Sequence, residues 1–423
     1  MSGSRVIVAG CGPAGIMAAG RAAARGLEVI LLEKMPKPAR KLGLTGKGRC
    51  NLTNSAELAE FLARFGPQGK FLRPALQSFS NQDLRDFLQQ LGVETLQERG
   101  GRIFPAAHSA PQLARILVAW AKEQGARLMT GTSLQDILLQ EGRLQGALLQ
   151  QEGAQGSRRF EMPAASLVLA TGGACYPATG SSGEGQRLAQ GLGHTVSPLR
   201  PALVPLQTKG QLAPRLQGLS LRNVQASLYV QGKRKAKEFG ELVFTHFGVS
   251  GPIVLSLSRQ VAGDLEQGRQ VSLVLDLKPA VSQDQLQARI SRVLQQRGRQ
   301  GMKQVLKEFL PPKMIQPCLE QTGISPEQKA SQVDAGQQKR LRLWLKELCL
   351  EVQACRPLEE AIITAGGVSL REVDPRSMAS RLVPGLYLAG EILDLDADTG
   401  GFNLQAAFST GWLAGESVDP GGL

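Results

Sequence analysis

The fold is decided by a stretch near the start of the chain, Val6-Ile7-Val8-Ala9-Gly10-Cys11-Gly12-Pro13-Ala14-Gly15. The apolar run at its beginning predicts a buried parallel strand. The three glycines have the spacing G-x-G-x-x-G, and an alanine-rich helical pattern over residues 16–26 follows them. A second apolar strand, residues 28–32, ends at Glu33, about twenty positions beyond the glycines. The stretch therefore predicts a strand–turn–helix–strand unit.

Each glycine of this unit has a physical role in binding a dinucleotide. Gly10 allows the tight turn, Gly12 lets a diphosphate approach the backbone, and Gly15 lets the helix pack close to the strand. The N-terminus of the helix supplies free N–H groups and a positive dipole end that suit phosphates. Pro13 and Ala14, directly before the helical pattern, are therefore also predicted contacts to the cofactor.

Glu33 indicates which dinucleotide the unit suits. Its carboxylate can accept hydrogen bonds from both hydroxyls of an adenosine ribose and would repel a 2′-phosphate, so FAD or NAD fits better than NADP. A glycine-rich turn in an ordinary α/β protein is the alternative, and it leaves Glu33 without a role.

The composition limits the classes of protein to consider. The chain has 423 residues, of which 42% are hydrophobic, and this predicts one large domain or two to three ordinary ones. We expect no signal peptide, because the first apolar run is a short strand, and no membrane span, because the sequence contains no run of about 18 apolar residues. Six scattered cysteines and three unclustered histidines favour a cytoplasmic protein with reduced thiols and no metal site.

The positive charge is concentrated in one part of the chain. The net charge is +13, and residues 201–350 contain 22 basic and 11 acidic residues, which gives that segment +11. The other 273 residues are close to neutral. A localised basic segment is expected for a protein with a polyanionic partner, although a solvated basic face explains the composition equally well.

A long irregular segment, residues 34–54, follows Glu33. Loops of this kind usually lie at the surface and carry function. Its cations suit phosphate or flavin oxygens, and the predicted contacts to the cofactor are Lys34, Arg40, Lys41, Gly48, Arg49, Cys50 and Asn51. Cys50 follows Arg49, so its pKa could be lowered, or it could serve as an acid. A packed, inert thiol is the alternative.

Regular elements are expected further along the chain. Helical periodicity covers residues 56–65, 71–79, 82–91 and 110–124, with Ser80 or Asn81 as the N-cap of the third helix. A meander of strands is expected over residues 127–131, 133–140, 144–151 and 157–162. A buried strand, residues 166–170, then leads into a turn at Thr171 and Gly172. In two-dinucleotide-binding flavoproteins such an A-T-G turn closes over the cofactor.

The sequence changes character near Ser197. Prolines mark a boundary there, and short strands are expected over residues 202–207, 224–230 and 269–277. A cationic hairpin tip holds candidate RNA contacts, Lys233, Arg234, Lys235 and Lys237. His246 lies between two phenylalanines, so it is either a buried structural residue or one that faces the flavin or substrate.

Residues 281–350 are expected to form helices with basic faces. Arg340 and Arg342 lie close to Trp344, and cations beside an aromatic suit RNA, although a solvated helix face is the commoner explanation. The α/β pattern returns at Glu360. A strand ends at Gly390 and Glu391, whose carboxylate can hold a ribityl chain.

A helix then begins near Gly401, Asn403 and Leu404 and continues to about residue 415. Its N-terminus can point at the pyrimidine side of a flavin, where reduced flavin is negative. The pattern therefore predicts an α/β fold. A Rossmann-like two-dinucleotide-binding FAD domain (residues 1–195 and 357–423) is interrupted by a β-rich insert (196–280) and a basic helical insert (281–356).

The chain resembles the BaiN/RdsA-type flavoproteins. The resemblance is carried by residues 45–54 (TGKGRCNLTN), 101–105, 172–185, 240–252, 364–368 and 388–405, which span most of the chain. It implies FAD as cofactor and hydride transfer from reduced flavin to an activated C=C bond. Some members resemble ene reductases acting on steroids, and others resemble dihydrouridine synthases acting on ribosomal RNA.

The basic segment favours the second activity. We therefore expect an FAD-dependent reductase that makes dihydrouridine in 23S ribosomal RNA, with NAD(P)H as a transient electron donor. Cys50 is the first candidate for the proton donor and His246 the second. The alternatives are a small-molecule flavin oxidoreductase (ene reductase or amine oxidase type), and a redox-inactive RNA-binding protein that FAD stabilises.

Overall fold

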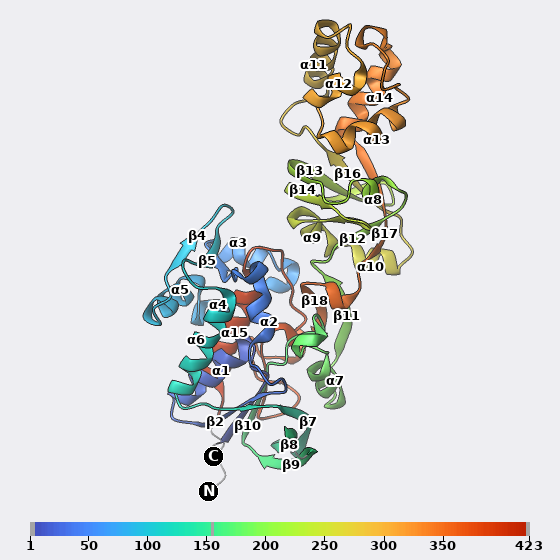
Figure 1. Ribbon diagram of the computed structural model, residues 1–423. Coiled ribbons are helices and arrows are strands. Elements are labelled where there is room, and N and C mark those ends of the chain that lie inside the picture. The colour runs from blue at the N-terminus through green and yellow to red at the C-terminus, as the bar shows by residue number, and fades with distance from the viewer. Residues whose placement is uncertain (1–4, 154–155, 420–423) are drawn as a thin grey trace. The chain divides into compact units, whose positions relative to one another are not determined.

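The computed structural model describes residues 5–153 and 156–419, and the chain forms two compact units (Figure 1). Unit 1 is Met1–Pro201 with Leu358–Leu423, and unit 2 is Ala202–Pro357. The predicted β-rich and helical inserts thus share one compact unit, apart from residues 196–201. They do so because β17 (Leu348–Cys355), at the end of the predicted helical insert, is a strand of the barrel described below.

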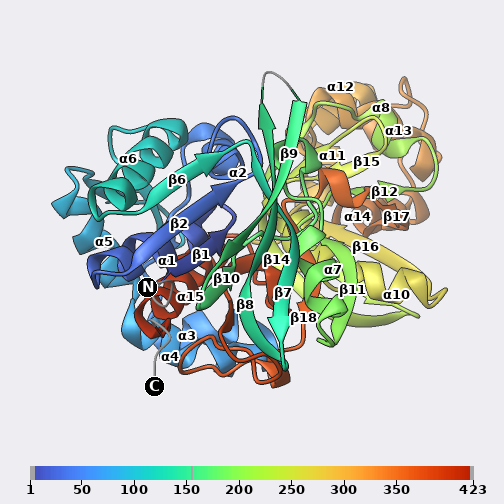
Figure 2. The same ribbon diagram turned by 90° about the horizontal axis from the view of Figure 1, so that it is seen from below.

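Unit 1 is built on a parallel sheet with the strand order β19-β10-β1-β2-β6 (Figure 2). Its strands are β1 (Arg5–Ala9), β2 (Glu28–Glu33), β6 (Arg127–Thr130), β10 (Ser166–Leu169) and β19 (Leu386–Leu388). All neighbouring pairs run parallel. The apolar run of β1 is buried, as a central strand covered on both faces requires. The predicted α/β, Rossmann-like fold is confirmed.

Helices cover one face of this sheet: α1 (Pro13–Ala24), α6 (Ala110–Glu123) and α15 (Phe402–Ser417). Two glycines bring the backbones of α15 and α1 together. A Cβ atom on Gly411 would lie 2.1 Å from the carbonyl oxygen of Ala14, and one on Gly415 would lie 2.4 Å from that of Ala18. Because residues four apart share one helix face, the two helices pack in parallel, with the second half of α15 against the first turns of α1.

The opposite face carries an antiparallel sheet of β7 (Thr132–Gln140), β8 (Arg143–Gly153) and β9 (Gly156–Pro163). The sequence predicts these strands but also assigns residues 127–131 to the same meander, which is wrong. Those residues form β6, which pairs in parallel with β2. The chain turns at Gly131, whose φ of +63° favours glycine, before β7 begins.

The segment after β2 is less irregular than predicted. It contains the short helix α2 (Arg40–Leu44) and a 3₁₀ turn, Thr45–Gly48. Three of the predicted helices follow as α3 (Leu58–Ala63), α4 (Arg73–Ser78) and α5 (Asn81–Gln90). Ser80 is the N-cap of α5, because its hydroxyl accepts from the N–H of Asp83 while the Asp83 carboxylate accepts from the N–H of Ser80.

The remaining elements of unit 1 are small. β3 (Thr53–Asn54), β5 (Arg102–Pro105) and β4 (Thr95–Gln97) form an antiparallel sheet. Helix α7 (Glu184–Gly191) follows the β10 turn, and β11 (Val196–Ala202) pairs with β18 (Ile363–Val368).

Unit 2 contains a closed barrel with the strand order β12-β15-β14-β13-β16-β17. Its strands are β12 (Leu206–Thr208), β13 (Ser220–Val230), β14 (Lys233–Phe244), β15 (Gly248–Ser250), β16 (Val271–Asp276) and β17. The strand predicted at residues 202–207 is divided between β11 and β12. Leu203 has a φ of +53°, which breaks the extended backbone between them.

Helices fill the rest of unit 2: α8 (Leu212–Arg215), α9 (Pro252–Ser258), α10 (Val261–Glu266), α11 (Gln283–Gln296), α12 (Met302–Val305), α13 (Pro312–Thr322) and α14 (Ala335–Lys346). The predicted helical character of residues 281–350 is confirmed. The prediction of Trp344 as an aromatic beside RNA-binding cations is wrong. Its ring is buried in the core of unit 2, and its Nε1 donates to Gln321 at 2.7 Å.

Candidate functional site

The predicted dinucleotide turn lies at the carboxyl end of β1, where open α/β sheets bind their ligands. Gly10 and Gly15 are enclosed by protein. A Cβ on Gly10 would lie 2.5 Å from the carbonyl oxygen of Ala170, and one on Gly15 would lie 1.8 Å from that of Gly10. At Gly12, by contrast, no described atom lies within 4 Å of the position that a Cβ would take. The turn is therefore open at Gly12, directly before the N-terminus of α1.

Glu33 ends β2 at the same edge of the sheet. One of its carboxylate oxygens accepts from the N–H of Met35 at 2.9 Å. Burial raises the pKa of this carboxyl group, while the N–H groups of Met35 and Cys11 and the positive charges of Lys34 and Arg40 oppose the rise. The acid therefore lies beside the glycine turn, where an acceptor for ribose hydroxyls is needed.

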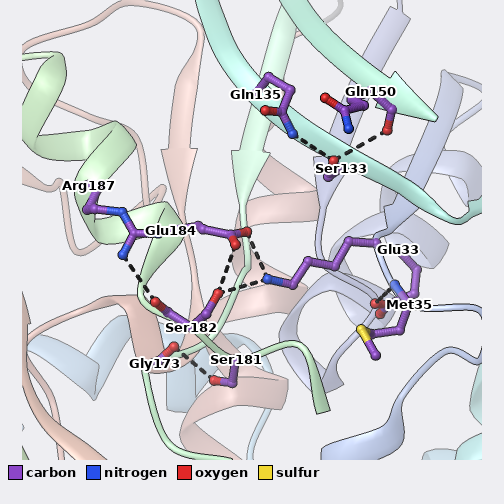
Figure 3. A network of polar contacts seen from close by, with 11 residues as sticks. Glu33, Met35, Ser133, Gln135, Gln150, Gly173, Ser181, Ser182, Glu184 and Arg187 are labelled. Carbon is purple, nitrogen blue, oxygen red and sulfur yellow. Dashed lines mark hydrogen bonds and ion pairs between the residues drawn. The ribbon is translucent and has the colours of Figure 1, made fainter. Parts of the chain in front are cut away.

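Lys34 contacts protein groups instead of standing free for a cofactor. Its ammonium donates to Ser182 and Glu184, both at 2.8 Å. Burial alone would raise the pKa of Glu184, but the Lys34 ammonium and the Ser182 hydroxyl hold it below its usual value. Figure 3 shows the side chains of Ser182 and Glu184 facing one another, with Arg187 of α7 donating to the carbonyl of Ser182 at 3.2 Å. Lys34 thus ties the loop before α7 to the end of β2.

A chain of polar contacts links the irregular segment to the C-terminal part of unit 1. Lys41 donates to one oxygen of Glu391 at 2.7 Å, and the N–H of Thr364 donates to the other at 2.9 Å. The Thr364 hydroxyl accepts from the N–H of Ala174 at 2.8 Å and lies 3.1 Å from the Cys175 sulfur. Burial, and then the Glu391 carboxylate, raise the pKa of Cys175 to about 11. Lys41 and Glu391 are thus predicted residues that the fold brings together.

The Thr45–Cys50 segment has an uncommon backbone. Lys47 and Cys50 have φ values of +56° and +59°, in the left-handed region that side-chain-bearing residues rarely adopt. The Cys50 thiol is fully buried, and burial raises its pKa to about 12. The prediction of a lowered pKa is therefore wrong. Cys50 holds a proton at neutral pH, but in this structure it is enclosed.

Arg49 does not act on Cys50 because its guanidinium points elsewhere. It lies 4.4 Å from the centroid of the Phe104 ring and forms an ion pair with Glu98. Arg40 is exposed at the start of α2. Gly48 is open, with no described atom within 4 Å of the position of a Cβ. The buried Oδ1 of Asn51 has no hydrogen-bond partner among the described residues.

The turn after β10 is fixed by α7. Gly172 has a φ of +77°, and its carbonyl oxygen accepts from Gln186 at 2.9 Å. The buried Thr171 hydroxyl points at Gly185, where a Cβ would lie 1.9 Å from it, and it has no hydrogen-bond partner in the described part of the chain. The Thr171 side chain therefore faces α7.

The N-terminus of α15 is held by side chains. The Asn403 amide accepts from the N–H of Ala397 at 2.8 Å and donates to its carbonyl at 2.9 Å, which closes the preceding loop. The sequence predicts Asn403 as a cofactor contact, but its side chain is committed to this loop. Gly401 has a φ of +96°, and a Cβ there would lie 2.3 Å from the carbonyl oxygen of Thr53. Leu404 is half-buried in the first turn.

Sequence reasoning missed two residues that organise the site, Asn54 and Thr364. Asn54 donates to the carbonyl of Gly400 at 3.1 Å and to that of Gly100 at 3.0 Å, and so connects β3 to the loop before α15. Both residues lie in stretches that carry the family resemblance. Their side chains are small and uncharged, so nothing in their type alone pointed to them.

Unit 2 holds the second proton-donor candidate. His246 is exposed, with its ring edge-on to Phe247 at a centroid distance of 4.9 Å. The alternative of a buried structural histidine is therefore wrong. The guanidinium of Arg356 covers the same phenylalanine at 4.6 Å.

The predicted cationic hairpin tip is the beginning of β14. Lys233, Arg234, Lys235 and Lys237 are all exposed, and the turn itself is formed by residues 231 and 232. Among the other RNA candidates, Arg340 donates to the carbonyl of Thr322 at 2.7 Å. The Arg342 Nε is buried and has no hydrogen-bond partner among the described residues. Arg340 is therefore engaged by the helical part of unit 2.

Residues 5–153 and 156–419 show neither a metal centre nor a membrane span. No cluster of three His, Cys, Asp or Glu side chains in them could hold a metal ion. None of their helices is both long enough and apolar enough to cross a bilayer.

The arrangement in unit 1 fits FAD. The open position at Gly12 leaves room for a diphosphate against the backbone, at the N-terminus of α1. Glu33 lies at the same edge of the sheet, where an acceptor for an adenosine ribose would be needed. Gly390 reaches the first turn of α1, since a Cβ on it would lie 2.8 Å from that of Ala14. Helix α15 packs in parallel on α1, so its N-terminus points in the same direction as that of α1.

Comparison with known proteins agrees with this geometry. A family model described as the Rossmann domain of HI0933-like proteins matches residues 4–417. A 3-dehydro-bile acid delta(4,6)-reductase of Clostridium scindens is 32% identical over 98% of this chain and 99% of its own. A ribosomal RNA dihydrouridine synthase of Escherichia coli is 29% identical over 97% of each chain.

The solved structures extend the fold comparison. The 3-ketosteroid delta1-dehydrogenase of Sterolibacterium denitrificans superposes with a TM-score of 0.55, covering 98% of this chain and 99% of its own, at 14% identity. The family match over nearly the whole chain, together with the relative at 32% identity, shows that this chain belongs to the HI0933-like Rossmann family of FAD-dependent oxidoreductases.

Proposed function

We propose that the protein is an FAD-dependent reductase that converts a uridine of 23S ribosomal RNA to dihydrouridine, with NAD(P)H as the electron donor. The observation that carries the proposal is the charge of unit 2. Residues 202–357 contain 23 basic and 12 acidic residues, a net charge of +11. Such a unit attracts a polyanion, with an affinity that falls as salt rises.

The outer face of β13 and β14 adds aromatic groups to this charge. Tyr229 lies opposite Arg234, and Phe239, which is 52% exposed, follows Lys237 by two positions on the same strand. Residues directly opposite each other on antiparallel strands share a face, as do residues two apart on one strand. Cations interleaved with aromatic rings suit single-stranded nucleic acid, whose bases stack while its phosphates pair.

Unit 1 would supply the reducing chemistry. Bound and reduced FAD supplies a hydride from its N5 atom to the C5–C6 double bond of uracil. Gly12 and the α1 N-terminus would hold the diphosphate, Glu33 the ribose, and the Lys41–Glu391 pair the region of the ribityl chain. The target uracil must be unpaired or flipped, because a stacked base is inaccessible.

The proton for the neighbouring carbon needs a donor from the chain, and Cys50 and His246 stay our candidates. The raised pKa of Cys50 keeps its thiol protonated, which a donor requires, but the thiol must become uncovered to reach a substrate. His246 is already exposed.

The test is mass spectrometry of nucleosides from 23S ribosomal RNA, with and without this gene in its host. Dihydrouridine that disappears on deletion and returns with the intact gene establishes the substrate, and with it a cytoplasmic site of action. An unchanged level of dihydrouridine contradicts the proposal.

A second candidate is a reductase of C=C bonds in small molecules. It is favoured by the 32% identity to a bile acid reductase, which exceeds the identity to the dihydrouridine synthase. Turnover of steroid enones by the purified holoenzyme, together with unchanged dihydrouridine in the deletion strain, would favour this candidate and leave the charge of unit 2 unexplained.

A further inference from the structure

Unit 2 contains a cavity of about 330 Å³ that the proposed chemistry does not use. Its lining residues come from three places in the chain: the start of β13, the pair Leu277 and Lys278 directly after β16, and residues 309–314, which lead into and begin α13. Leu221 and Val224 from β13 form one wall, and Phe309 and Met314 form the other. A cavity of this size with mainly apolar walls is typical of sites for small ligands or single groups of larger ones.

Cations gather at this apolar cavity. Lys278 and Arg222 line it, and Arg289 lies over the ring of Phe309, with its guanidinium 5.5 Å from the ring centroid. Burial, and then the positive charge of Arg289, lower the pKa of Lys278. The Lys278 ammonium has no hydrogen bond or ion pair among the described residues, so its charge is left uncompensated by protein.

The carboxylates near the cavity are already paired. Asp276 forms an ion pair with Lys346 at 2.6 Å, and Glu308 pairs with Arg297. None of the described residues that line the cavity is acidic. Arg222 has a distant partner, Glu241 at 3.9 Å, and its side chain is 82% exposed. The cavity thus combines an aromatic and apolar wall with unneutralised positive charge.

We propose that this cavity holds one unpaired nucleotide of an RNA ligand, with its base in the apolar part of the cavity and its phosphate at Lys278 and Arg222. The proposal rests on RNA as the substrate class and adds a second contact to it, outside the flavin site. The base supplies a flat apolar face, and the phosphate supplies the anion that Lys278 lacks. Ordering one unpaired nucleotide in unit 2 would help to select the RNA that carries the target uridine.

The test is binding of uridine 5′-monophosphate to the FAD-loaded full-length protein by calorimetry. Lys278→Gln should weaken binding at least tenfold. Lys235→Gln removes the same charge from an exposed position on β14 outside the cavity and should change binding less than twofold. Phe309→Leu should weaken binding of the nucleotide and leave binding of inorganic phosphate unchanged. Thermal melts show whether each variant is folded.

Three results would overturn the proposal: no binding at millimolar nucleotide, equal losses in the Lys278 and Lys235 variants, or inorganic phosphate binding as tightly as the nucleotide. The nucleotide could also change the flavin absorbance and bind the Lys278→Gln variant as tightly as the wild type. That result would show that it binds outside the cavity and would contradict the proposal. These outcomes are independent of the dihydrouridine level in 23S ribosomal RNA, so failure here is distinguishable from failure of the proposed function.

Discussion

The ammonium of Lys41 lies 2.7 Å from a carboxylate oxygen of Glu391, although 350 positions separate the two residues in the chain. Their side chains are 25% and 21% exposed. The pair joins the irregular segment after β2 to the turn after β19, and Thr364 fixes the second oxygen of Glu391. It therefore connects the two segments of unit 1, residues 1–201 and 358–423, which are separated in the sequence by the whole of unit 2.

The Lys41–Glu391 pair should show energetic coupling. In the apoprotein, Lys41→Met and Glu391→Gln should each lower the free energy of unfolding, and the double variant should recover about 1 kcal/mol relative to the sum. Urea denaturation of the four proteins measures this. The exposed pair Lys209–Glu351, with side chains 56% and 39% exposed, is the matched control and should show almost no coupling. Additive losses at Lys41 and Glu391 would contradict the prediction.

The glycines of the dinucleotide turn should differ in what they affect. Gly12→Ala places its methyl group in open space, so the fold should stay stable while the affinity for FAD falls at least tenfold. Gly15→Ala forces a Cβ to within 1.8 Å of the Gly10 carbonyl and should destabilise the protein by about 3 kcal/mol. Thermal melts and flavin fluorescence titration separate the two effects. A Gly12→Ala protein that binds FAD normally would exclude this turn from the diphosphate site.

The thiols should differ in reactivity. The thiolate is the nucleophile, and with a pKa of about 12 only about one Cys50 thiol in ten thousand is ionised at pH 8. Iodoacetamide should therefore label the exposed Cys349 in the native protein and leave Cys50 and Cys175 unlabelled. Peptide mass spectrometry measures this, with labelling in urea as the control. Rapid labelling of native Cys50 would refute its enclosure.

The same thiol makes stability depend on pH at the alkaline end. Its pKa is raised on folding, so the unfolded chain loses the proton first. The contribution of Cys50 to stability is complete below about pH 9 and declines as pH rises towards 12. Urea denaturation of the wild type and Cys50→Ala at pH 8 and pH 10 should show a smaller loss in the variant. Equal losses would mean that Cys50 is not the group responsible.

Variants of the two candidate proton donors can distinguish loss of proton donation from loss of FAD reduction. If Cys50 donates the proton, Cys50→Ala should slow dihydrouridine formation by about a hundredfold or more, with FAD bound and its reduction by NAD(P)H unchanged. His246→Gln tests the second candidate in the same assay. Full turnover in both variants would remove both residues from the mechanism.

The cations of β14 should contribute to the salt dependence of RNA binding. Changing Lys233, Arg234, Lys235 and Lys237 together to glutamine should weaken binding and flatten the plot of log affinity against log salt by about 0.7 for each RNA phosphate that is no longer neutralised. The exposed Arg127 and Arg143 of unit 1, changed to glutamine, are the control. An unchanged slope in the β14 variant would mean that RNA binds elsewhere.

The sequence alone determined the local pieces of this protein. The order of residues around Gly10, Gly12 and Gly15 specifies a turn that few other sequences form, and Glu33 follows at the spacing set by one helix. Alternation and turn residues placed most strands, because strand and helix periodicities are local properties. The concentration of positive charge in one segment was also visible from the order of residues alone.

Only the tertiary structure decided which partners the side chains have. In the folded chain Lys34 pairs with Glu184, and Arg49 contacts Phe104 and Glu98. The side chain of Asn403 hydrogen-bonds within its own loop. It enclosed Cys50, so that burial rather than the neighbouring arginine sets its pKa. Ion pairs and desolvation depend on which distant segments meet, and that is fixed by packing of the whole chain. A list of residue types in sequence order does not contain this information.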